Sequence, residues 1–255
     1  MNQQYGVVAV LDALGAKTYS ESEISRFLKS REIVLELLRQ NTEGVADDLK
    51  GCPLETFTFN DTVVIVLNTG TNQPNYRHIR AFCKLMRTFV VDSLVNKILF
   101  RGCISIGSFR MDVSSNTIMG VAVTDAAEWY DKADWVGLIA TPHATLQIRF
   151  EEERGERDWK YLMLDYNVPL NGGQYVRLKA VNWPKVFLVR KISPCKDGEA
   201  PRVKLLELLS WHQVPRGTEG KYFNTVEFFD HAIAEAKKEV PAKDTKKKSD
   251  NAQKK

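Results

Sequence analysis

The fold of this chain is decided by the stretch Thr56-Phe57-Thr58-Phe59-Asn60-Asp61-Thr62-Val63-Val64-Ile65-Val66-Leu67. β-Branched and aromatic residues run on both sides of a single Asn-Asp step, a pattern typical of a tight β-hairpin with Asp61 at or beside its turn. A second strand-like run, from Tyr5 to Leu11, is followed directly by Asp12. If these strands are neighbours in one sheet, the two carboxylates lie side by side at the ends of the strands.

The elements around the hairpin predict an α+β fold. Apolar periodicity predicts one helix from Ser20 or Ser22 to about residue 40 and another over 75–98, followed by a strand over 99–107 that ends in glycine. The resulting order, β-α-β-β-α-β, is the ferredoxin-like split βαβ plan, with helices on one face of a mostly antiparallel sheet. In that plan the first strand lies beside the central hairpin, so Asp12 and Asp61 can meet.

The second half of the chain predicts an α-β unit and additions to this plan. A short helix should follow residues 116–120, a strand should cover 135–140, and Thr141-Pro142 should open the next helix. A charged connection over 151–157 leads to strands over 161–164 and 181–189, which flank an Asn-Gly-Gly turn. Two closing helices are expected over 203–211 and 225–237.

Composition places the chain among ordinary globular proteins, with 44% hydrophobic and 27% charged residues. No apolar run is long enough to span a membrane and no secretory signal opens the chain, so we expect a cytoplasmic protein. The four cysteines are widely separated and favour neither a disulfide framework nor a zinc site. Residues 1–238 should form a single domain, whereas 239–255 read as a disordered basic tail. The modest net charge of +4 gives no reason to expect a nucleic-acid partner.

Two carboxylates at adjacent strand ends suit hard cations such as Mg²⁺ or Mn²⁺, which prefer oxygen ligands. A pair of such ions lowers the pKa of an attacking hydroxyl and neutralises leaving phosphates. The backbone carbonyl of Ala13 or Leu14 is a further candidate ligand. By spacing alone, however, a capping or turn role is favoured for each of Asp12 and Asp61.

Four motifs taken together resemble the landmarks of class III nucleotidyl cyclases. They are Asp12 after its apolar strand, Asn60-Asp61 in a hairpin, Arg101-Gly102-Cys103-Ile104-Ser105-Ile106-Gly107, and Gly120-Val121-Ala122-Val123-Thr124-Asp125-Ala126-Ala127. The resemblance covers about residues 5–145. It implies that the ribose 3′-hydroxyl of a nucleoside triphosphate attacks its own α-phosphate and that pyrophosphate leaves. It also implies two metal ions on Asp12 and Asp61, and a head-to-tail homodimer with its active sites at the subunit interface.

The chain departs from the family pattern at three positions. Phe57 stands where purine cyclases carry a base-selecting Lys, Thr124 matches their Asn, and Glu128 replaces their transition-state Arg. An aromatic residue at position 57 removes a donor to the purine edge and offers a stacking surface instead, although a core strand residue fits equally well. The change is similar to that in bacterial anti-phage pyrimidine cyclases, which make cyclic UMP or cyclic CMP.

The missing Arg leaves the charge of the pentavalent phosphate to another cation. The candidates are Arg101, Arg110, Lys132, Lys179 and Lys185, of which Lys179 is favoured because it lies in a late strand, as a triphosphate-binding Lys does in the family. Glu128 is also compatible with an inactive site.

These features predict a pyrimidine nucleotide cyclase that converts UTP, or else CTP, with Mn²⁺ or Mg²⁺. Its product would act on a separate cyclic-nucleotide-sensing effector. Two alternatives stay open: a purine (adenylate or guanylate) cyclase with a rearranged pocket, and a non-catalytic nucleotide-binding protein on the same fold.

Overall fold

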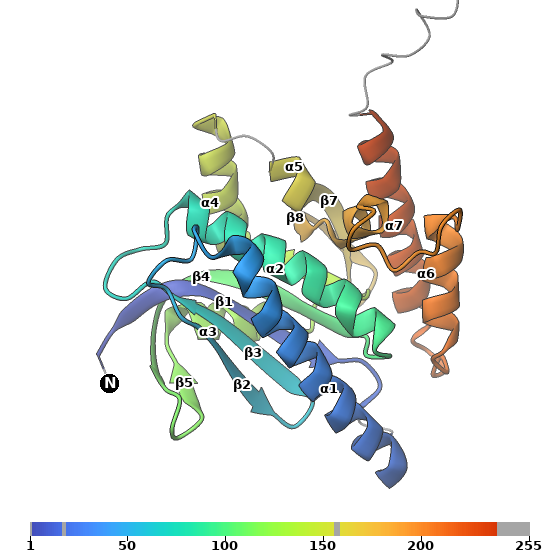
Figure 1. The fold of residues 1–255 in the computed structure, drawn as a ribbon, viewed down its shortest axis with the longest axis horizontal. Coiled ribbons are helices and arrows are strands. Elements are labelled where there is room, and N and C mark those ends of the chain that lie inside the picture. Colours follow the sequence, from blue (N-terminus) through green and yellow to red (C-terminus); the bar gives the residue numbers. More distant parts are fainter. Residues whose placement is uncertain (1, 17–18, 156–158, 239–255) are drawn as a thin grey trace, which may run out of the picture.

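A computed structural model describes residues 2–16, 19–155 and 159–238 of the chain. Its centre is a twisted sheet in the order β2-β3-β1-β4-β6-β8-β7, with β5 paired to β4 outside that path (Figure 1). All pairs are antiparallel except β4–β6. The predicted tail, residues 239–255, lies outside the described residues.

The first half of the chain confirms the ferredoxin-like plan. Its elements run in the order β1 (Gln4–Ala13), α1 (Glu21–Asn41), β2 (Leu54–Phe59), β3 (Thr62–Asn68), α2 (Tyr76–Val95) and β4 (Phe100–Asp112). The strand order β2-β3-β1-β4 puts β1 between β3 and β4, as that plan requires. Strands β1 and β3 are almost wholly buried, because β-branched and other apolar residues fill both faces of each strand.

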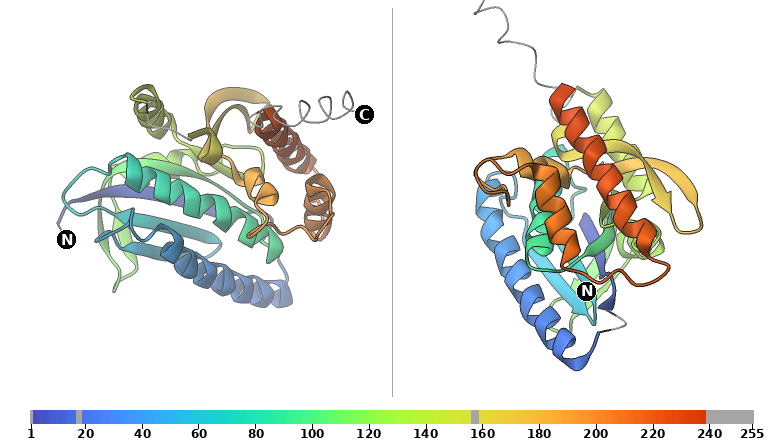
Figure 2. Two further views of the ribbon diagram at one scale, coloured as in Figure 1. Left: turned by 45° about the horizontal axis from the view of Figure 1, so that its top comes forward. Right: turned by 90° about the vertical axis from the view of Figure 1, so that its right-hand side faces the viewer.

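The second half extends the sheet past β4. Its elements are β5 (Thr117–Met119), α3 (Val121–Trp129), β6 (Gly137–Ala140), α4 (Pro142–Glu153), α5 (Trp159–Leu162), β7 (Met163–Leu170), β8 (Gln174–Val181), a 3-10 helix (Trp183–Leu188), α6 (Pro201–Ser210) and α7 (Glu219–Lys238). Helices α6 and α7 stand together at one side of the molecule (Figures 1 and 2).

Local capping explains where the two long helices begin. Ser20 caps α1 in a capping box with Glu23, and Asn75 caps α2 by accepting from the N–H groups of Arg77 and His78. The predicted start of each helix is confirmed. The second helix ends at Val95, three residues before the predicted end, because Lys97 adopts a positive φ of 63° and turns the chain.

The prediction that helices cover one face of the sheet is wrong for α3. Figure 1 shows α1 and α2 in front of the sheet and α3 behind it. The Cys103 thiol donates to the carbonyl of Ala126, and the Ser105 hydroxyl donates to Asp125, so these β4 side chains face α3. Because alternate residues of a strand point to opposite faces, Ile104 and Ile106 face the other side.

Three further strand predictions are corrected. Strand β4 runs past Gly107 to Asp112: this glycine lies beside Ala122 of α3 within a continuous strand and does not end it. The short strand β5 was not predicted. The second hairpin is tighter than predicted, since β7 and β8 are joined directly by the Asn-Gly-Gly turn and residues 183–188 form a 3-10 helix.

None of the described helices is long and apolar enough to cross a membrane. The four cysteines are free thiols, as predicted.

Candidate active site

The hairpin of β2 and β3 has a two-residue turn. Phe59 pairs with Thr62, which leaves Asn60 and Asp61 between the strands. Asn60 adopts a positive φ of 53°, a conformation that asparagine tolerates better than most residues. The guanidinium of Arg31 in α1 donates to the carbonyl of Asn60 at 2.8 Å and so ties the turn to the helix.

Strand pairing brings Asp12 and Asp61 together, as the sequence predicted. Asp12 lies opposite Thr62 in the β1–β3 ladder, and the N–H of Ala13 donates to the carbonyl of Asp61 at 3.2 Å. The two aspartates are therefore one step apart across neighbouring strands. The strand pairing thus confirms that the two aspartates lie side by side at neighbouring strand ends.

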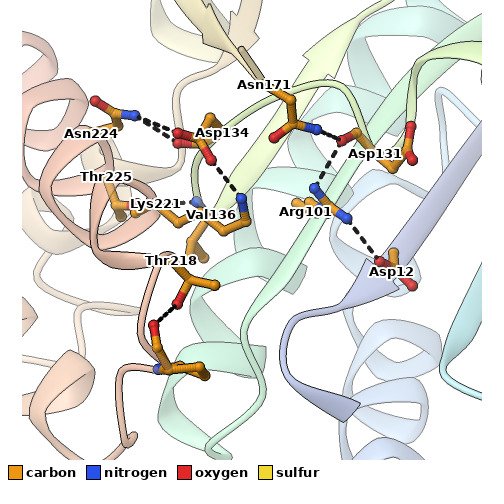
Figure 3. A network of polar contacts seen from close by, with 11 residues as sticks. Asp12, Arg101, Asp131, Asp134, Val136, Asn171, Thr218, Lys221, Asn224 and Thr225 are labelled. Atoms are coloured by element: carbon orange, nitrogen blue, oxygen red, sulfur yellow. Dashed lines mark hydrogen bonds and ion pairs between the residues drawn. The ribbon is translucent and has the colours of Figure 1, made fainter. Parts of the chain in front are cut away.

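Arg101, on β4, lies next to Asp12 on the side of β1 opposite β3. It pairs with Asp12 in the β1–β4 ladder, and its Nη2 lies 3.4 Å from Asp12 Oδ2. Its Nη1 donates to the carbonyl of Asp131 at 2.8 Å (Figure 3). The side chains of Arg101 and Asp12 are only 15% and 16% exposed, so their charges interact with little screening by solvent.

Tyr130, at the end of α3, faces the same group of charges. Burial raises the pKa of Tyr130, the charges of Asp12, Asp131 and Asp61 raise it further, and Arg101 lowers it. Three carboxylates thus act against one guanidinium at this hydroxyl. A bound divalent cation would offset this excess of negative charge.

This donor set fits Mg²⁺ or Mn²⁺. Asp12 and Asp61 supply carboxylate oxygens at neighbouring strand ends, and Ala13 contributes backbone at the same point. Within the described residues, no three His, Cys, Asp or Glu side chains are grouped closely enough to hold a metal ion. Two carboxylates alone suit an ion whose remaining ligands are water and substrate phosphate, a coordination that Mg²⁺ prefers.

Phe57 does not offer a stacking surface. Its side chain lies in the hydrophobic core and is 1% exposed. Of the two interpretations of this residue, the structure favours the core strand aromatic.

The other residues expected to bind substrate lie away from the aspartate pair within one chain. Thr124 is exposed on α3, six residues before Tyr130, which is about 9 Å along a helix axis. Lys179 lies on β8, three strands from β1, where its buried ammonium binds Glu152 and Asp165 at 2.7 and 2.8 Å. Those three residues line a separate cavity of about 1000 Å³.

Glu128 lines a smaller hollow of about 540 Å³ at the end of α3, together with Tyr130, Asp131 and Lys132. Glu128 is therefore close in sequence and space to residues that face the aspartate pair. It brings a negative charge to this hollow.

The contacts that link Asp131 and Asn171 to Arg101 were not predicted from the sequence. Asp131 binds Arg101 through its backbone carbonyl, which any residue type would supply. The same carbonyl accepts from the side-chain amide of Asn171 at 2.7 Å. Asn171 belongs to the predicted turn, but nothing in its sequence context indicated a contact 40 residues away.

No protein-family model matches the chain, and no curated protein matches it significantly. Among solved structures it is similar to the adenylyl cyclase CyaB from P. aeruginosa, with 11% identity and a TM-score of 0.41. It is also similar to the catalytic core of a rhodopsin-guanylyl cyclase with converted specificity, in complex with ATPαS, with 12% identity and a TM-score of 0.44. Each match covers 71% of this chain and 96% of the other chain. At this level of similarity the comparisons establish neither a family nor an activity.

Proposed function

We propose that the chain is a metal-dependent nucleotidyl cyclase. The observation that carries the proposal is the position of Asp12 beside Asp61 at adjacent strand ends, with Arg101 against them. In the reaction, the ribose 3′-hydroxyl gives its proton to water, its oxygen forms a bond to the α-phosphorus, the bond from that phosphorus to the bridging oxygen breaks, and pyrophosphate leaves. Bound Mn²⁺ or Mg²⁺ would lower the pKa of the 3′-hydroxyl and neutralise phosphate charge.

The preferred substrate in this proposal is UTP, with CTP second. The support is the absence of a Lys at position 57, where the buried Phe57 supplies no donor that reads a purine edge. Production of cyclic UMP in anti-phage defence, read by a separate effector, stays a prediction from the resemblance.

The active form in this proposal is a homodimer. Thr124 lies away from Asp12 and Asp61 within one chain, so a site that uses it needs a second copy, whereas the buried Lys179 is bound by Glu152 and Asp165 of its own chain. Three exposed apolar side chains at the β4–β5 hairpin and the start of α3 are available for such contact: Val113, Met119 and Val121 are 51%, 56% and 69% exposed.

The deciding experiment incubates the protein with each of the four nucleoside triphosphates and Mn²⁺, and identifies products by mass. We expect 3′,5′-cyclic UMP and pyrophosphate. Cyclic AMP or cyclic GMP as the main product would overturn the pyrimidine assignment and support a purine cyclase. Tight metal-dependent nucleotide binding without any cyclic product would overturn the enzyme assignment and support a non-catalytic binding protein.

A further inference from the structure

We propose that the cavity between α2, α5 and the β7–β8 hairpin, here called the α2–α5 cavity, binds a small phosphorylated molecule. Its volume of about 1000 Å³ is at the upper end of the range for small-molecule sites. Strand β8 is three strands from β1 in the sheet, and neither Asp12 nor Asp61 lines this cavity. The site is therefore separate from the candidate active site and independent of the proposed function.

Basic residues line the α2–α5 cavity from two helices. Arg80 and Lys84 belong to α2, and Lys160 belongs to α5, which packs against α2 and β7 (Figure 1). Arg80, Lys84 and Arg87 stand at positions i, i+4 and i+7, so they share one side of α2. The helix thus directs a row of positive charge toward α5.

The carboxylates on the sheet side of the cavity are already paired. The Lys179 side chain is only 2% exposed and binds Glu152 and Asp165 at 2.7 and 2.8 Å. Arg149 also binds Asp165 at 2.8 Å. Two cations therefore balance two carboxylates in this cluster, which leaves little negative charge to neutralise the lysines on the two helices.

Lys84 and Lys160 are not neutralised in this way. The Lys84 ammonium donates to the carbonyl of Gly44 at 3.0 Å, and neither lysine forms an ion pair with a carboxylate in the described part of the chain. Asp48 is the one further carboxylate among the described residues that line the cavity. The two lysines outnumber it, and such an excess of positive charge attracts anionic ligands.

A buried guanidinium lies behind the wall of the cavity. Arg87 is 2% exposed and donates to the carbonyl and the hydroxyl of Tyr161, which lines the cavity, at 3.0 and 3.2 Å. Its guanidinium also lies 4.0 Å from the centre of the Tyr161 ring. No carboxylate among the described residues pairs with it. Burial lowers the pKa of Arg87, and an anion in the cavity would offset the cost of keeping this charge buried.

An unused hydrogen-bond donor indicates what kind of anion fits. Trp159 lines the cavity and is 2% exposed, and its Nε1–H is buried without a partner among residues 2–16, 19–155 and 159–238. Buried donors normally meet an acceptor. A phosphate group offers three strong acceptor oxygens as well as charge, so one group can meet both the indole and the lysines. The rings of Trp159 and Tyr161 provide an apolar wall for the rest of the molecule.

The test measures binding of inorganic pyrophosphate and of ADP by calorimetry in EDTA, so that no metal ion holds phosphate at the strand-end aspartates. Lys84→Gln and Lys160→Gln should each weaken pyrophosphate binding about tenfold, and Trp159→Phe should weaken it about threefold. Lys29→Gln is the matched control, because Lys29 is an exposed lysine on another helix, α1. It should bind pyrophosphate as wild type does. Circular dichroism verifies the fold of each variant.

The comparison of the two probes identifies the source of the phosphate. ADP that binds more tightly than pyrophosphate would indicate a nucleotide, because its base then contacts the aromatic wall. Pyrophosphate that binds as tightly as ADP or more tightly would indicate a ligand without a base. Either result supports a phosphate site.

Four results would overturn the inference. They are a wild-type protein that binds neither probe, unchanged pyrophosphate binding in a folded Lys84→Gln or Lys160→Gln variant, citrate that binds as tightly as pyrophosphate, and altered pyrophosphate binding in Asp61→Asn, which would place the anion at the candidate active site. A protein that cyclises no nucleotide would overturn the proposed function and not this site, since the binding test uses neither metal nor turnover.

Discussion

At the scale of single residues, the carboxylates of this protein fall into different environments. Asp12 lies against Arg101 at the ends of neighbouring strands, whereas the half-buried Asp92 on α2 accepts from the side-chain amide of Asn41 at 3.2 Å. Burial raises the pKa of Asp92 to about 6, and the hydrogen bond from Asn41 lowers it only in part. Because the ordinary value is 3.8, the folded protein binds the proton more tightly than the unfolded chain does.

This difference predicts that Asp92→Asn raises thermal stability at pH 7.5. At pH 7.5 the native carboxylate is ionised, which lowers the free energy of unfolding. This loss of stability grows as pH rises from about 4 through 6 and is absent below both pKa values. The amide keeps an acceptor for Asn41, and the gain should vanish at pH 3.5. The measurement is melting temperature against pH. Asp112→Asn is the control, since hydrogen bonds from Ser114 and Ser115 lower the pKa of Asp112 and its loss should not stabilise. Equal gains at both pH values would refute the assignment.

At the scale of elements, the close pairing of β1 and β4 holds Arg101 against Asp12. Gly102 makes this approach possible: a Cβ there would overlap the carbonyl oxygen of Val10 and lie 2.9 Å from Leu11 Cα. Gly102→Ala should therefore lower the free energy of unfolding by about 2 kcal/mol. Gly44→Ala, where nothing lies within 4 Å of the added carbon, should be close to neutral. Urea denaturation of both variants checks this, and equal stabilities would contradict the proposed contact.

The same scale shows what the sequence could predict. The β1 and β2–β3 strands were readable because a mainly apolar run from Tyr5 to Leu11 leads up to Asp12, and Val, Ile, Phe and Thr flank Asn60-Asp61. The extent of β4 was not readable, because a glycine such as Gly107 is a common strand end, and its place inside the sheet is set by tertiary packing. The anchor of Arg101 was also hidden, since a backbone carbonyl at Asp131 leaves no mark in residue type.

At the scale of the whole molecule, the proposed homodimer would use the exposed apolar side chains at the β4–β5 hairpin and the start of α3 as a contact surface. Met119→Glu should place a charge in that contact and shift the protein toward monomer, with a fall in activity that is largest at low protein concentration. Val203→Glu is the matched control, because Val203 is 59% exposed on α6, an element in contact with α2 and α7. Sedimentation velocity reports the mass of each. A wild-type protein that is monomeric while fully active would contradict the dimer.

The carboxylate of Asp61, in the β2–β3 hairpin, is the central feature of the proposed site. The measurement is the rate of cyclic UMP formation from UTP and Mn²⁺ by wild type, Asp61→Asn and Asp197→Asn, the last of which changes an exposed loop carboxylate. We predict that Asp61→Asn retains its fold by circular dichroism and loses activity by about 100-fold or more, while Asp197→Asn matches wild type. A folded Asp61→Asn variant with full activity would contradict the proposed site.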